Sequence, residues 1–123
     1  MPARFDSIKP HIPILALYAE NEKVENADAL WNNYGYHLQD VADYSRARAA
    51  FERALKIDEA TLGFDHPKVA IRVNNLGMVM KAQGDSVGAR AAFGRALAIF
   101  KKFLPPEHPN IKVVQGNLDS LEE

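Results

Sequence analysis

Adjacent asparagines recur in this chain at a spacing of 42 residues, as Asn32-Asn33 and again as Asn74-Asn75. A carboxamide offers two hydrogen-bond donors and an acceptor, so it matches the polar groups of a peptide bond. Asparagine is a mediocre helix former, and two adjacent copies that recur need a reason. Two interpretations stay open. The asparagines bind the backbone of a partner, or they bond to a neighbouring helix and serve only the fold.

Residue types that catalyse reactions or bind metals form no cluster along the sequence. The chain has no cysteine, which excludes disulfides, thiol catalysis and cysteine-ligated zinc. Its four histidines are far apart, and His66 and His108 precede prolines as loop or cap residues do. The serines lack a nucleophile context, and we expect the carboxylates to lie on exposed helix faces. The sequence therefore predicts no enzyme, no cofactor and no metal.

Charge and hydropathy argue against nucleic acid and membrane partners. The net charge is −1, and basic residues are not interleaved with aromatic ones as in nucleic-acid binders. The apolar stretch 12–19 contains a proline and is too short to span a membrane or to make a good signal peptide. We expect a cytoplasmic protein.

The 42-residue spacing extends well beyond the asparagines. When 29–70 is aligned with 71–112, 16 of the 42 residues are identical, including the segments around Phe51 and Phe93. A fixed period of this length indicates a repeat architecture. Within each unit the apolar residues recur three or four apart, which is the period of a helix. The sequence thus predicts an all-α fold built from repeated helix pairs.

Helix boundaries follow from local signals. Asp43 separates the two helices of the first unit, and the second helix begins near Tyr44. Pro67 suits a first helical turn, preceded by Asp65 or His66 as the N-cap. The second unit then has helices at about 67–83 and 86–104, and the repeated start signal predicts a last helix at about 109–121.

Four segments follow from this register: an N-terminal capping helix with its connection at 1–28, a first unit at 29–66, a second at 67–108, and the first helix of an incomplete third unit at 109–123, acting as a C-terminal cap. The solenoid would hold about six helices. Glycines recur at Gly35 and Gly77 inside helices, where each costs about 1 kcal/mol relative to alanine. Their recurrence predicts close packing of the second helix against the first.

The pattern resembles the tetratricopeptide-repeat signature of a tryptophan/leucine/glycine/tyrosine first helix and an alanine/phenylalanine/alanine second helix. Ordinary units have 34 residues, whereas this longer unit is similar to that of kinesin light chains and of repeat arms in bacterial and archaeal signalling proteins. The matching residues are Trp31, Tyr34, Gly35, Leu38, Ala47, Phe51 and Ala54 in the first unit, and Leu76, Gly77, Met80, Ala89, Phe93 and Ala96 in the second.

The resemblance implies that partners bind along the concave face lined by the first helices. Carried over position by position, the partner-binding residues would be Asn32, Asn33, Tyr36, Gln39, Asn74, Asn75, Met78, Lys81 and Asn117. Ala29, Ile71, Val113 and Ser120 occupy the same face, and Gly116 stands where an asparagine would repeat.

We therefore expect a protein–protein interaction module that binds a peptide or a partner segment. Two alternatives remain open. The ends of the solenoid, where the next repeat would stack, could join copies into a homo-oligomeric scaffold. The chain could also be a sensor-arm fragment of a larger signalling ATPase, as a weak similarity of the segment 8–15 suggests.

Overall fold

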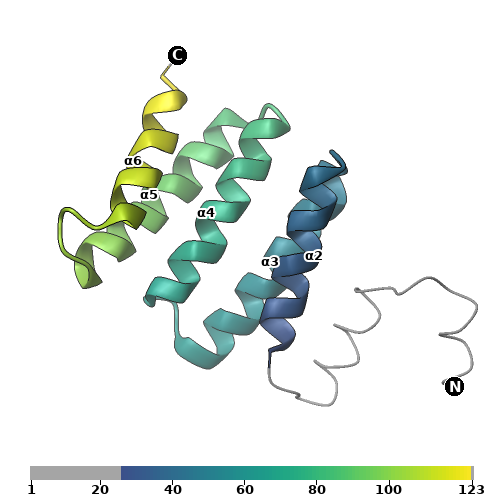
Figure 1. Ribbon diagram of the computed structural model, residues 1–123, viewed down its shortest axis with the longest axis horizontal. Helices are drawn as coiled ribbons and strands as arrows, with labels where there is room; N and C mark the ends of the chain where they lie inside the picture. The colour runs from purple at the N-terminus through teal and green to yellow at the C-terminus, as the bar shows by residue number, and fades with distance from the viewer. Residues whose placement is uncertain (1–25, 123) are drawn as a thin grey trace, which may run out of the picture.

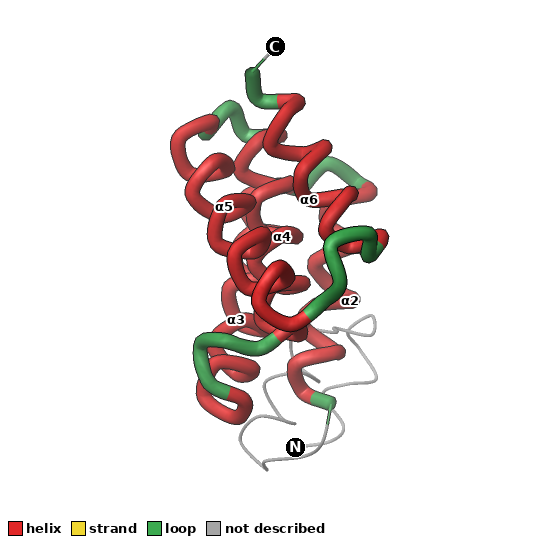
Figure 2. Tube along the Cα trace, turned by 90° about the vertical axis from the view of Figure 1, so that its left-hand side faces the viewer, coloured by secondary structure: helices red, strands yellow, loops and turns green. Residues whose placement is uncertain are grey.

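A computed structural model describes residues 26–122, which form five α-helices and no strand. The helices are α2 (Ala27–Asp40), α3 (Tyr44–Leu62), α4 (Pro67–Ala82), α5 (Ser86–Phe103) and α6 (Pro109–Ser120). Each packs against its neighbours in the chain. In Figure 1, α2, α4 and α6 lie side by side in one layer, with α3 and α5 behind them. Figure 2, turned by 90°, places α3 and α5 on one side and α2 and α6 on the other.

Side-chain caps start four of these helices at equivalent points of the repeat. Asp43 accepts a hydrogen bond from the backbone N–H of Arg46, and Asp85 accepts one from Gly88. His66 and His108 cap α4 and α6, since the Nδ1 atom of each accepts from the N–H two residues on, at 3.0 Å. The imidazole thus does the work of an aspartate or serine at an N-cap, because Nδ1 satisfies one of the free donors of the first turn.

Phenylalanine packed against glycine forms the centre of each helix pair. Phe51 on α3 and Phe93 on α5 are fully buried. A Cβ atom placed on Gly35 would lie 2.6 Å from Cε1 of Phe51, and one on Gly77 would lie 2.6 Å from Cε1 of Phe93. Only glycine lets the ring lie this close to the backbone of the facing helix. The expected reason for both glycines is confirmed.

Two apolar clusters share α4. The first joins α2 and α3 with Leu76 and Val79 of α4, while the second joins α4, α5 and α6. α4 therefore contributes to both clusters, and this continuity makes the helix pairs one stack rather than two separate units.

The helix bounds agree closely with those expected from the sequence, with two differences to report. The first concerns the segment 1–28: its predicted capping helix lies outside the described residues, so the sixth helix is not part of this description. The second concerns the start of α2 at Ala27, which places the expected 28/29 boundary inside the first helical turn. Ala27 and Asp28 are buried, so tertiary packing sets this start, whereas the Asn26 side chain makes no cap bond.

Candidate binding surface on the first-helix layer

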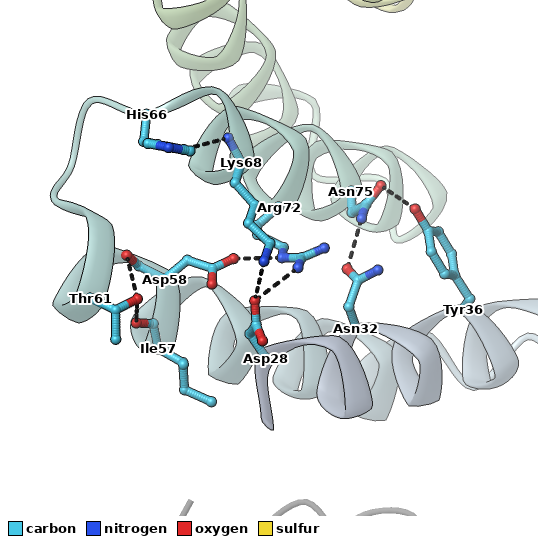
Figure 3. A network of polar contacts seen from close by, with 10 residues as sticks. All are labelled: Asp28, Asn32, Tyr36, Ile57, Asp58, Thr61, His66, Lys68, Arg72 and Asn75. Atoms are coloured by element: carbon cyan, nitrogen blue, oxygen red, sulfur yellow. Dashed lines mark hydrogen bonds and ion pairs between the residues drawn. The ribbon is translucent and has the colours of Figure 1, made fainter. Parts of the chain in front are cut away.

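Carboxamides connect the first helices of successive repeats. Nδ2 of Asn75 on α4 donates to Oδ1 of Asn32 on α2 at 2.9 Å, and the hydroxyl of Tyr36 donates to Oδ1 of Asn75 at 3.2 Å (Figure 3). Asn32 and Asn75 are both buried. A buried amide that lost its partner would destabilise the fold, so this pair contributes to the stacking of the repeats.

The same connection recurs at the next interface, between α4 and α6. Nδ2 of Asn117 donates to Oδ1 of Asn74 at 3.0 Å. Lys81 donates to the Ser120 hydroxyl at 2.7 Å, and that hydroxyl donates to the backbone carbonyl of Asn117. In both pairs the second asparagine of one unit donates to the first asparagine of the preceding unit, 43 residues away. Asn74 and Asn117 are only half-buried, so this pair borders solvent.

The other expected partner-binding residues lie on the same layer without joining these pairs. Asn33 is exposed, Gln39 is half-buried, and Met78 is 41% exposed. Tyr36 is also exposed, although its ring packs edge-on against Phe51 with 5.4 Å between centroids. The sequence thus placed the expected residues on one face of the molecule.

A hollow of about 210 Å³ opens on this face between α4 and α6. Ile71, Asn74 and Asn75 of α4 form one wall of the hollow, and Asn110, Val113 and Val114 of α6 form the other. Tyr36 and Phe100 complete the lining. Ile71 and Val113 were expected on this face. Asn110 was missed, because it lies in the first turn of α6, before the positions that the family pattern covers.

A buried ionic cluster lies between α2, α3 and α4, and the sequence analysis missed it. Arg72 donates through Nε to Oδ2 of Asp58 at 2.7 Å and through a terminal nitrogen to Oδ2 of Asp28 at 3.2 Å (Figure 3). The Lys68 ammonium group reaches the same Asp28 oxygen at 3.0 Å. Arg72 thereby ties its helix to both helices of the preceding pair.

Burial perturbs both carboxyls of this cluster. Burial, together with a hydrogen bond to the neighbouring Asp28 carboxylate, raises the pKa of Asp58 to about 6, despite the opposing effect of Arg72. Burial also disfavours ionisation of Asp28, but hydrogen bonds from Asp58 and Lys68 outweigh it and hold the pKa of Asp28 below its usual range. Asp58 is therefore the carboxyl of the two that takes up a proton first as the pH falls.

The expectation that carboxylates lie on exposed helix faces is wrong for these two aspartates, since Asp58 is 1% exposed and Asp28 is nearly as buried. One signal pointed to Asp58: it follows Ala54 by four residues and Phe51 by seven, and so lies on the apolar stripe of α3. A charge at that position needs a buried partner, which Arg72 provides.

The described part of the chain offers no site for a metal ion, because no three histidine or acidic side chains converge there. None of the described helices is long and apolar enough to cross a membrane. The arrangement of side chains on the first-helix layer is suited to hydrogen bonding and apolar contact.

Helix pairs stacked with this period, joined by small residues and phenylalanine, define a helical-repeat protein of the binding type. The tetratricopeptide-repeat family model matches residues 26–118, and the chain belongs to that family, with repeats of the kinesin-light-chain-like type. Such repeats are a general protein–protein interaction module and are typically non-catalytic, and no catalytic family is identified.

One solved structure with the same fold is BtubC (BKLC) from P. vanneervenii, with a TM-score of 0.78 and 24% sequence identity. The match covers 87% of this chain but only 44% of that protein, so the chain spans less than half of its length. A search of the curated proteins found no match.

Proposed function

We propose that this chain binds a peptide segment of a partner protein along the face formed by α2, α4 and α6. The observation that carries the proposal is the hollow between α4 and α6, flanked by exposed apolar side chains on the same face. Ile71, Met78 and Val113 are large apolar residues left in contact with solvent there. Apolar groups beside convergent polar groups in a concavity are typical of a binding site.

The expected site residues then divide into two roles. Tyr36, Met78, Asn74 and Lys81 have surface available to a partner and form its contact surface, together with Asn33, Gln39 and Asn117. The buried pair Asn32 and Asn75 acts by holding α2 and α4 in register, because its amide groups already bond to one another and to Tyr36. The partner is a protein, and the chain itself catalyses no reaction.

A selection experiment tests this function. A random peptide phage library is selected on the full chain, and the recovered peptides are measured against two single variants, Ile71→Asp and Met78→Asp. Val87→Asp is the matched control, because Val87 is 82% exposed and lies on α5, in the other layer. We expect roughly tenfold or greater loss of affinity in the first two variants and no loss in the control, since burial of one such side chain gives that much.

Two results would overturn the proposal. One is peptides that bind the Ile71→Asp and Met78→Asp variants as well as the unchanged chain. The other is a failure to recover any peptide together with a molar mass, measured by light scattering, that rises above 13.7 kDa with concentration. That second result would favour self-assembly through the ends of the stack.

A further inference from the structure

The hollow between α4 and α6 and the ionic cluster occupy equivalent places in successive repeats. Subtracting 42 from the lining residues Phe100, Asn110 and Val114 gives Asp58, Lys68 and Arg72. All three of those are members of the ionic cluster. The fourth member, Asp28, corresponds to the fully buried Ala70. The two interfaces therefore share a backbone plan and differ in what fills the gap between first helices.

Charged side chains fill the gap at the first interface. Arg72 extends from α4 to Asp28 and Asp58, and Lys68 covers the Asp28 carboxylate from the same helix. Asp28, Asp58 and Arg72 are all buried, so the guanidinium group and the two carboxylates satisfy one another inside the protein. This interface closes itself with its own residues.

Neutral side chains line the gap at the second interface. No ammonium, guanidinium, imidazole or carboxylate group is among the lining residues of the hollow. Phe100 and Val114 are buried in the apolar cluster, where they offer no polar atom to a ligand. A charged group that entered this hollow would lose water and meet no counter-charge, which is unfavourable.

Two carboxamides at the hollow keep hydrogen-bonding groups in reserve. Oδ1 of Asn74 accepts from Asn117, but its Nδ2 donors have no partner among the described residues. The Asn110 side chain makes no hydrogen bond within 26–122, since only its backbone N–H is engaged, by His108. Both amides line the hollow and can pair with the N–H and C=O groups of an extended peptide.

We propose that the α4–α6 hollow binds one uncharged apolar side chain of the partner, of leucine, methionine or phenylalanine size, while Asn74 and Asn110 bind the adjacent peptide backbone. The size follows from the volume, because a cavity of about 150 Å³ admits benzene and this hollow holds about 210 Å³. The equivalent gap between α2 and α4 is closed by the ionic cluster, so the partner's apolar anchor has a single place along the described face. This inference rests on the proposed function, since it names the class of peptide that the same face selects.

Terminally blocked pentapeptides of sequence Ala-Ala-X-Ala-Ala, with X as Leu, Phe, Ala, Lys or Asp, provide the probe. Binding to the full chain is followed by NMR, using the methyl groups of Ile71, Val113 and Val114 and the side-chain amides of Asn74 and Asn110. We expect the Leu and Phe peptides to shift these signals and to bind about tenfold more tightly than the Ala peptide. The Lys and Asp peptides should bind no better than Ala.

A charge at the rim of the hollow provides the matched variant. Val113 is 55% exposed, so Val113→Lys leaves the fold intact and places an ammonium group beside the hollow. We expect this variant to lose the roughly tenfold preference for Leu over Ala, whereas Val87→Lys on α5 should retain it.

The possible outcomes separate this inference from the proposed function. Peptides that shift only Met78 or Tyr36, or that bind equally whatever X is, would overturn the assignment of the hollow and leave the face as a binding surface. Failure of all five peptides to shift any signal of the hollow would also overturn it, even if library-selected peptides bind elsewhere on the face. Loss of binding by the selected peptides themselves is the separate test of the proposed function.

Discussion

Replacement of Asp58 by asparagine should remove a specific pH dependence of stability. The Asp58 carboxyl is buried between α3 and α4, and Arg72 Nε donates to its Oδ2 atom at 2.7 Å. Asparagine has nearly the same shape, and its carbonyl oxygen can accept the same bond. The substitution therefore changes the ability of the side chain to ionise while leaving its packing in place.

The magnitude follows from the raised pKa of Asp58. Its value of about 6 lies above the value in an unfolded chain, which is about 3.9, so the folded protein keeps this proton where the unfolded chain has lost it. The resulting stability is fully present below the unfolded value and is lost as the pH rises through the folded one. Two pKa units correspond to about 3 kcal/mol of unfolding free energy, and roughly half of it falls between about pH 5 and about pH 8.

Urea denaturation followed by circular dichroism, at these two pH values, measures the effect. We expect Asp58→Asn to gain about 1.5 kcal/mol relative to the unchanged chain when the pH is raised from about 5 to about 8. Asp28→Asn is the control. Because Asp28 is already ionised across this range, its loss should destabilise the protein by about 3 kcal/mol at both pH values. Parallel pH profiles for Asp58→Asn and the unchanged chain would refute the reasoning.

Two further predictions concern packing and the amide pairs. Gly77→Ala should lower the unfolding free energy by about 1–3 kcal/mol, because its Cβ would lie 2.6 Å from Phe93, whereas Gly116→Ala meets open space and should raise it by about 0.5–1 kcal/mol. Thermal melts of both variants decide this, and equal effects would contradict it. Asn75→Ala should cost about 2 kcal/mol, since it removes the partner of the buried Asn32 amide, while Asn33→Ala on the exposed surface should stay within about 0.5 kcal/mol in urea denaturation. A similar cost for both would show that the pairing contributes nothing specific.

The sequence alone predicted the scaffold well, because each helix carries local signals of its own. Asp43 caps α3 as its position indicated, and His66 caps α4 where Pro67 pointed to a helix start. The recurrence of Gly35 and Gly77 correctly indicated a close contact, although not the ring that makes it. These features depend on residues a few positions apart or on one alignment of the chain with itself.

The candidate site was harder to predict, because its contacts join residues about 40 positions apart. A period of 42 aligns Asn32 with Asn74, yet the bonded partner of Asn32 is Asn75, one position further on. The offset arises because the second asparagine of each pair faces the preceding helix and the first faces the following one. Only the stacked helices reveal which amides are used by the fold and which keep free donors.

Positions where the repeats differ carry information that their identities cannot. Phe51 and Phe93 agree because every helix pair needs the same core, so their agreement identifies the fold and says little about binding. Arg72 and Val114 occupy equivalent places, yet one closes its interface with charge and the other borders a neutral hollow. Because the backbone plan is the same, the choice of side chain alone decides which gap is available to a partner. In this chain that difference favours the α4–α6 interface as the place where an apolar anchor binds.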